Sequence, residues 1–116
     1  MSDSILRDKS KVFAKDIVFL CRKLKQNGVE SALINQLLRS GTSVGANVHE
    51  AQYAQGTKDF ISKFEIALKE CNESEYWLEL LYEVNSLSKS EFEHFKKDCI
   101  ELRRMLVSTV TTLKSK

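Results

Sequence analysis

The hydrophobic residues of this chain recur at intervals of three, four and seven positions, a spacing that places side chains on one face of an α-helix. The pattern predicts four helices, at about 4–26, 31–55, 57–84 and from 89 almost to the C-terminus. Proline is absent and only four glycines occur, so few residues interrupt these helices. Long helices joined by short connections favour antiparallel neighbours. The sequence therefore predicts one all-α domain over residues 1–116, folded as an up-down-up-down antiparallel four-helix bundle.

Local signals mark where the helices begin and end. Gly28 is expected to end the first helix, while Ser31 and Thr57 are expected to cap the N-termini of the second and third helices. The clearest signal is Ser88-Lys-Ser-Glu91, a capping box in which each of the two outer side chains bonds the backbone N–H of the other residue. A fourth helix is therefore predicted to begin directly after Ser88.

The segment 36–50 combines helical apolar spacing with an unusual number of small and polar side chains. Gly41 and Gly45 lie on its apolar side, where the absence of side chains lets another backbone approach closely. The opposite side carries a polar row formed by Gln36, Arg39, Ser43, Asn47 and Glu50. This polar row is either a solvated helix face or a contact with another subunit or partner, in which its arginine meets a carboxylate such as Glu70 or Glu73.

The third predicted helix has a second apolar face that its own core does not require. This face spans an arc of roughly 60° and is displaced from the inward stripe by more than roughly 90°. It consists of Ile66, Glu73, Trp77, Leu80 and Val84. This face either widens the intramolecular core or buries Trp77 against another subunit, since aromatic residues are enriched at interfaces. Glu73, Trp77 and Leu80 are therefore candidate interface residues.

The formal net charge of +2 is too small to imply a nucleic-acid partner, but the charge is unevenly distributed. Residues 7–25 carry seven Lys and Arg against two Asp. A basic ridge within about 80° of helix surface, almost opposite the apolar face, consists of Arg7, Lys11, Lys15, Arg22 and Lys25. If the first and fourth helices adjoin, the ridge is extended by Lys96, Lys97, Arg103 and Arg104. The ridge either keeps the protein soluble or binds nucleic-acid phosphates without sequence preference and with steep salt dependence.

Residues with catalytic or metal-binding chemistry do not form a recognisable set. Ser43, His49 and Glu50 lack the motif of a hydrolase triad, and the chain has no glycine-rich phosphate loop or dinucleotide fingerprint. Di-iron and di-manganese bundles need two Glu-x-x-His units. Here only Glu91 and His94 have that spacing, and Glu91 already belongs to the capping box. We therefore expect no enzyme activity, no metal centre, no cofactor and no small-molecule substrate.

The cysteines and the hydropathy bear on the cellular compartment. Cys21, Cys71 and Cys99 are odd in number and far apart, which favours buried free thiols over disulfides or a thiolate zinc site. The first residues lack the apolar core of a signal peptide, and no stretch approaches the roughly 20 apolar residues that span a bilayer. A cytoplasmic protein without membrane contact is expected.

Three blocks of the sequence resemble one bacterial family: QLLRSGTSVGANVHEA at 36–51, DFISKFEIALKE at 59–70 and ESEYWLELL at 73–81. They are similar to the four-helix bundle proteins encoded in 23S rRNA intervening sequences, which are often described as ribosomal-protein-like. The resemblance implies a ring-like homo-oligomer, a pentamer. It also implies a relation to the accessory protein of diversity-generating retroelements, which contacts nucleic acid and reverse transcriptase. The family itself has no settled biochemical function.

Two functional hypotheses follow from these features. The first is a non-enzymatic homo-oligomeric adaptor that binds RNA or another nucleic acid through basic ridges repeated around a ring, where repetition strengthens weak contacts by avidity. The second is a protein-interaction scaffold that binds no nucleic acid and whose polar row serves assembly.

Overall fold

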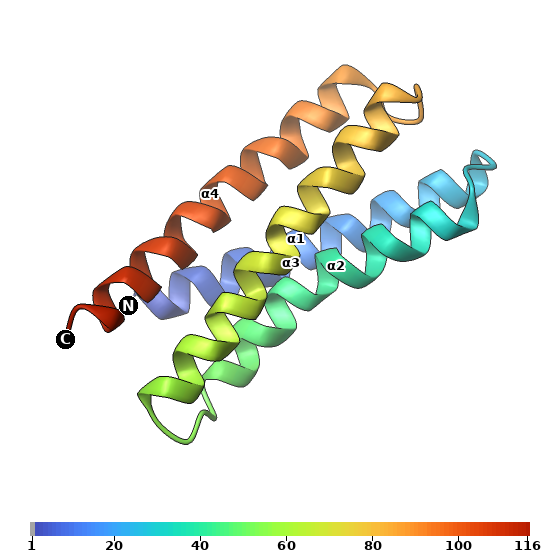
Figure 1. Cartoon of the computed structure of the whole chain (residues 1–116). Coiled ribbons are helices and arrows are strands. Elements are labelled where there is room, and N and C mark those ends of the chain that lie inside the picture. The colour runs from blue at the N-terminus through green and yellow to red at the C-terminus, as the bar shows by residue number, and fades with distance from the viewer. Residues whose placement is uncertain (1) are drawn as a thin grey trace.

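The structure is a computed structural model that describes the backbone of residues 2–116 and the side chains of residues 5–116. Its four helices are α1 (Ser2–Gln26), α2 (Ser31–Ala51), α3 (Thr57–Glu83) and α4 (Lys89–Lys114). Each helix packs on the next one along the chain, and α1 also lies beside α4. Figure 1 shows an elongated bundle, 47 Å long, with the beginning of α1 and the end of α4 at the same end. No strand occurs in the described part of the chain, and the predicted all-α four-helix bundle is confirmed.

The predicted apolar faces form one continuous core between the helices. The face of α1 is buried at Leu6, Phe13, Ile17, Leu20 and Leu24. The facing stripes bury Leu37, Val44 and Val48 of α2, Phe64, Ala67, Leu78 and Leu81 of α3, and Phe95, Leu102, Leu106 and Val110 of α4. Removing these side chains from water is the main force that holds the helices together. The three cysteines are also buried and free, as predicted, and burial raises the pKa of Cys21 to about 11.

Two of the predicted helix boundaries are confirmed. Gly28 follows α1 with a φ of 76°, a left-handed conformation that glycine adopts without strain, and the N–H of Val29 bonds the carbonyl of Leu24 at 3.1 Å. At the start of α4, the Glu91 N–H donates to Ser88 Oγ at 3.1 Å, and the Ser88 N–H donates to Glu91 Oε1 at 2.9 Å. The capping box is therefore formed on both sides.

The predicted N-caps of α2 and α3 are wrong. Ser31 is already the first helical residue of α2, so the cap position falls to Glu30, whose side chain makes no capping hydrogen bond. Thr57 is likewise the first residue of α3, and the cap position is occupied by Gly56. Gly56 has a φ of 130°, which only glycine adopts readily, so the direction of the chain into α3 depends on backbone freedom rather than on a hydroxyl cap.

The end of α2 also differs from the expectation. The helix ends at Ala51 instead of reaching residue 55, because residues 52–56 turn the chain back towards α3. The sequence pattern extends the helix further because no breaker precedes Gly56. Ala51 is buried in the core, and the N–H of Tyr53 bonds the carbonyl of Glu50, three residues back, at 3.0 Å, as in a turn.

Small residues let α2 approach both of its neighbours closely. A Cβ atom added to Gly41 would lie 2.9 Å from both γ-carbons of Ile17, and one added to Gly45 would lie 3.1 Å from the carbonyl oxygen of Ser10. The predicted use of these glycines for close packing is therefore confirmed, and the partner is α1. On the α3 side, the buried hydroxyl of Ser74 donates to Ser40 Oγ at 2.9 Å.

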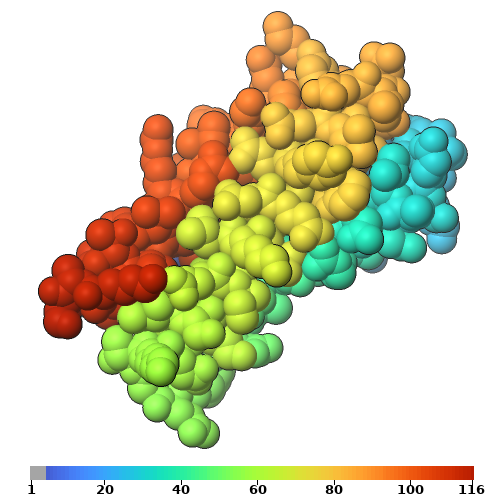
Figure 2. All heavy atoms as spheres, viewed as in Figure 1, coloured from blue at the N-terminus to red at the C-terminus, as the bar shows by residue number. Residues whose placement is uncertain are grey.

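The surface where α1 meets α4 is looser, and we call it the α1–α4 seam. The two helices draw apart towards the end that carries the connections 27–30 and 84–88 (Figure 1). Inside the seam, Phe13 and Phe95 meet edge to face with ring centroids 6.4 Å apart. Its polar side chains are Lys9, Asp16 and Lys23 of α1 and Glu91, His94, Asp98 and Glu101 of α4. In Figure 2, viewed as in Figure 1, α3 lies in front between α4 and α2.

Candidate nucleic-acid interface

The basic ridge of α1 is exposed along most of its length. Lys11, Lys15, Arg22 and Lys25 are all exposed. Within the described residues, no carboxylate forms an ion pair with any of these four side chains. The guanidinium of Arg22 lies over the ring of Phe19, 5.8 Å from its centroid, a cation–π contact that orders this side chain on the helix surface. These cations are therefore available to an anionic partner.

Two other lysines of α1 behave differently because they point into the α1–α4 seam. Lys9 pairs with Glu101 at 2.6 Å, and Lys23 pairs with Glu91 at 2.7 Å. The hydrogen bond from Lys23, with that from the Ser88 backbone, holds the pKa of Glu91 below its ordinary value. The other pair raises the pKa of Lys9 and lowers that of Glu101. The lysines that face α4 are therefore neutralised, whereas Lys11, Lys15, Arg22 and Lys25 have no ion pair among the described residues.

Arg7, the first residue of the ridge, lies at the end of the bundle where α1 begins and α4 ends. It donates a hydrogen bond to Oε1 of Gln52, in the turn after α2. A cavity of about 1000 Å³ opens at this end, and Arg7 and Arg104 both line it. Hydroxyl groups add to the lining from Thr57, Ser108, Thr109 and Thr112. The structure thus brings two of the predicted cations to one concave surface.

The other cations of α4 do not continue the ridge. Lys97 is exposed, and Lys96 lies over the ring of Phe92 at 5.5 Å. Arg103 faces α3, where it bonds Glu75 at 2.5 Å and Asn72 at 3.2 Å. The hydrogen bond with Glu75 raises the pKa of Arg103, and the carboxylate of Glu75 balances the charge of the guanidinium.

An exposed apolar stripe separates the basic ridge from the α1–α4 seam. Ile5, Val12 and Phe19 are spaced seven residues apart on α1 and are 53%, 54% and 59% exposed. At 100° per residue they lie between the ridge lysines and the residues that face α4. Beyond the end of the bundle where Arg7 and Arg104 line one cavity, this stripe lies between the ridge lysines of α1 and the cations of α4. The heptad spacing of this stripe was the signal that could have revealed it.

The polar row of α2 lies along the edge where α2 meets α3. Arg39 bonds both Glu70, at 3.1 Å, and Glu73, while Gln36 accepts a hydrogen bond from Arg39. Within the helix, Ser43 donates to the Arg39 carbonyl at 2.7 Å and Asn47 donates to the Ser43 carbonyl at 2.8 Å. At the far end, Glu50 pairs with Lys63 at 3.3 Å. The row is therefore bonded largely within the chain, and its contact with another subunit stays a prediction.

Trp77 lies half-buried on the same edge. Its ring packs against the hydrophobic core, and its Nε1–H donates to Glu73 at 3.1 Å. Leu80 is half-buried, while Ile66 and Val84 remain 39% and 51% exposed. The second apolar face of α3 thus widens the intramolecular core at Trp77 and leaves apolar surface on either side of it.

Comparisons with known proteins place this chain in a family. The family model described as 23S rRNA-intervening sequence protein matches residues 2–108. The chain belongs to this family. A solved structure from Bacteroides thetaiotaomicron, a protein of unknown function from the S23 ribosomal protein family, is 44% identical to it. The match has a TM-score of 0.93 and covers 96% of this chain and 99% of that one. No curated protein matches the chain.

Membership in the 23S rRNA-intervening sequence protein family confirms the resemblance seen in residues 36–81. The solved relative has unknown function, so the comparison supports the four-helix fold without assigning a role to any surface. Among the described helices of this family member, none combines the length and the apolarity that crossing a membrane requires.

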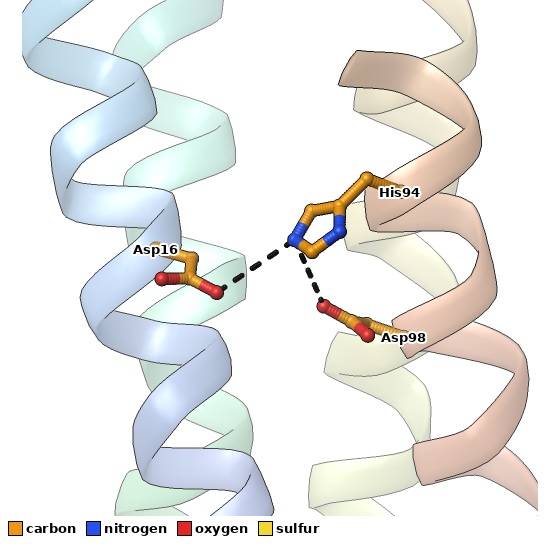
Figure 3. Close-up of side chains that lie close together, drawn as sticks. All are labelled: Asp16, His94 and Asp98. Carbon is orange, nitrogen blue, oxygen red and sulfur yellow. Dashed lines mark ion pairs between the residues drawn. The ribbon is translucent and has the colours of Figure 1, made fainter. Parts of the chain in front are cut away.

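One cluster in this 23S rRNA-intervening sequence protein was missed from the sequence. Asp16 of α1 meets His94 and Asp98 of α4 in the middle of the α1–α4 seam (Figure 3). The sequence pattern pairs His94 with Glu91 instead, and the capping box accounts for that glutamate. The signal for the cluster was the i, i+4 spacing of His94 and Asp98, but the third member comes from a distant helix.

Proposed function

We propose that this 23S rRNA-intervening sequence protein is a non-enzymatic adaptor that binds structured RNA, or another nucleic acid, through the basic ridge of α1. The observation that carries the proposal is the contrast on this helix: lysines facing α4 are paired, whereas Lys11, Lys15, Arg22 and Lys25 are exposed without carboxylate partners within the described residues. Lysine and arginine side chains bind phosphate groups and release the counterions around nucleic acid. Such binding does not depend on base sequence and requires no reaction at the site.

The proposal includes self-association in the cytoplasm. The family resemblance suggests a pentameric ring, and five copies of a weak ridge would bind a long phosphate backbone more tightly than one copy. Two apolar surfaces support an assembly: the stripe of Ile5, Val12 and Phe19, and the exposed residues on either side of Trp77. The polar row of α2, next to Trp77, would then lie at the edge of such a contact.

The test of nucleic-acid binding compares two triple variants of equal charge. Lys11→Glu, Lys15→Glu and Arg22→Glu reverse the ridge. Lys58→Glu, Lys69→Glu and Lys89→Glu change the net charge by the same amount at exposed positions outside it. With a structured RNA hairpin as probe, about four phosphate contacts per chain predict a roughly hundredfold loss of affinity between 50 and 200 mM salt. The ridge variant should lose binding at low salt, whereas the control variant retains most of it. An equal loss of RNA affinity in both variants would show that the basic ridge is not the binding surface.

The second candidate function is a protein-interaction scaffold, and the exposed apolar stripe beside the ridge favours it. Light scattering of the full chain should give a multiple of 13.3 kDa. Trp77→Glu should shift that population towards the monomer if the Trp77 face lies in the assembly. An oligomer that binds no RNA at low salt would favour the scaffold, and a monomer at all concentrations would exclude the proposed assembly.

A further inference from the structure

The middle of the α1–α4 seam brings together three side chains with metal-binding chemistry. Asp16 comes from α1, and His94 and Asp98 occupy successive turns of α4 (Figure 3). One ligand atom from each residue lies within 4.8 Å of the other two. The side chains are 36%, 59% and 31% exposed, so an ion in solution can reach them without any opening of the bundle.

The spacing of these atoms suits a shared ion better than direct hydrogen bonds. His94 Nε2 lies 3.8 Å from Asp16 Oδ2 and 3.6 Å from Asp98 Oδ2, and both separations are longer than hydrogen bonds. Around a tetrahedral zinc ion with bonds of about 2.0–2.2 Å, the ligand atoms lie roughly 3.3–3.6 Å apart. The two distances from His94 Nε2 are therefore within a few tenths of an ångström of those around a zinc ion, and the two carboxylates lie within 4.8 Å of each other. Figure 3 shows Nε2 of the imidazole directed at both carboxylates.

The charges along the seam favour cation binding at this position. Residues 9, 16 and 23 of α1 are spaced by seven and all face α4. At the two outer positions, Lys9 and Lys23 each balance a glutamate of α4. At the middle position α1 supplies Asp16 instead of a lysine, so two carboxylates meet with only an imidazole between them. A divalent cation would supply the positive charge that a lysine supplies on either side.

We propose that Asp16, His94 and Asp98 bind one divalent transition-metal ion of the zinc type, with a water molecule completing the coordination. An imidazole ligand favours such ions over Mg²⁺ and Ca²⁺, which prefer all-oxygen sites. The site differs from the di-metal centre considered from the sequence, because it lies on the surface of the bundle rather than in its core. Its effect is to tie α1 to α4 where these helices draw apart.

The experiment uses the untagged full chain and zinc chloride as the probe. Calorimetric titration should show saturable binding of one Zn²⁺ per chain. At a free zinc concentration of about one hundred times Kd, the melting temperature should rise by about 10 °C. The buried cysteines should not compete while the protein is folded. Substituting Co²⁺ for Zn²⁺ provides a visible absorption spectrum that reports the ligand geometry.

The variants separate this site from adventitious binding. His94→Gln and Asp16→Asn should each weaken Zn²⁺ binding by roughly tenfold or more and abolish the thermal shift. His49→Gln removes the other histidine, an exposed residue of α2 whose ring contacts that of Tyr53. This variant should bind zinc as the wild type does. The assignment is overturned if the wild type shows no saturable binding, if His94→Gln binds as tightly as the wild type, or if His49→Gln loses as much affinity. An equal thermal shift with Mg²⁺ would overturn the choice of ion.

Discussion

Helix α1 packs against its two neighbours in opposite ways. Against α2 it lies so close that Ile17 and Ser10 occupy the space that side chains at Gly41 and Gly45 would need. Against α4 it is joined mainly by long charged side chains, with the Phe13–Phe95 contact beneath them. The same helix therefore has one interface governed by shape and one governed by charge.

The two interfaces of α1 should therefore differ in how strongly a substitution in them lowers the stability of the bundle. A substitution that changes side-chain volume in a close-packed interface lowers the free energy of unfolding, because neither backbone can move without disturbing the core. A solvated ion-pair interface changes little when a charge is removed, since water replaces the lost partner. The α1–α4 seam is thus the place where the bundle can accept an ion or small shifts of α4, while the α1–α2 interface holds the basic ridge in position.

The largest effect is expected when the close-packed interface is filled. Gly41→Leu should lower the free energy of unfolding by about 3 kcal/mol, because the new side chain would enter the volume of the rigid, β-branched Ile17. Gly41→Ala should lower it by about 1 kcal/mol, since a gain in helix propensity offsets part of the clash. Urea denaturation measures both changes.

A matched control tests the cause. Asn35→Ala lies on the exposed side of α2 and raises helix propensity without a new contact, so it should leave stability unchanged or slightly higher. If Gly41→Leu proved as stable as the wild type, α1 and α2 would not be as closely packed as the structure indicates.

The next effect concerns the start of α4, where the capping box satisfies the first backbone N–H groups. Ser88→Ala removes the acceptor of the Glu91 N–H and should cost about 1 kcal/mol of unfolding free energy. Ser90→Ala, an exposed serine in the same turn, should have almost no effect. Equal effects of the two substitutions in urea denaturation would show that the hydroxyl cap does not stabilise α4.

A smaller effect should appear as a pH dependence of the seam. Glu91 has a lowered pKa in the folded protein, chiefly through its hydrogen bond from Lys23, so its charged form stabilises the fold more than its protonated form does. The stabilisation is complete above the ordinary pKa of 4.5 and is lost as the pH falls through the lower folded-state value. Because the carboxylate is partly exposed, we expect less than about 1 kcal/mol.

Glu91→Gln isolates this contribution, since glutamine also completes a capping box. The difference in unfolding free energy between the wild type and this variant should shrink between pH 7 and pH 3. A difference that stays constant over this range would exclude the Lys23 pair as its source.

Features of the fold that are encoded in local sequence patterns were predicted correctly. The core stripes, the end of α1 at Gly28 and the capping box at Ser88 are local patterns, and all of them were found from the sequence. The close packing at Gly41 and Gly45 was also predicted, and the neighbouring groups are the side chain of Ile17 and the backbone of Ser10. Patterns within single helices were thus sufficient to predict most of the fold.

Features that depend on two distant segments were not predicted. The N-cap of α2 was also misplaced, because Ser31 is already helical and Glu30 occupies the cap position. The Asp16–His94–Asp98 cluster requires knowing which faces of α1 and α4 meet. The sequence left open whether the cations of these helices join; Arg7 and Arg104 line one cavity, while the exposed stripe containing Phe19 separates the other ridge cations from α4. Helical periodicity describes each face but does not say what lies opposite it.

The smallest effect is expected at the outer pair of the seam. Lys9 and Glu101 are about half exposed, and their ion pair is screened by water and salt, so Lys9→Ala, Glu101→Ala and the double variant should share the urea midpoint of the wild type. A measurable coupling energy in this double-mutant cycle would mean that charge pairing itself holds α4 against α1. Its absence would leave the joining of the two helices to the Lys23–Glu91 pair, the Phe13–Phe95 contact and, in the presence of zinc, the cluster in the middle of the seam.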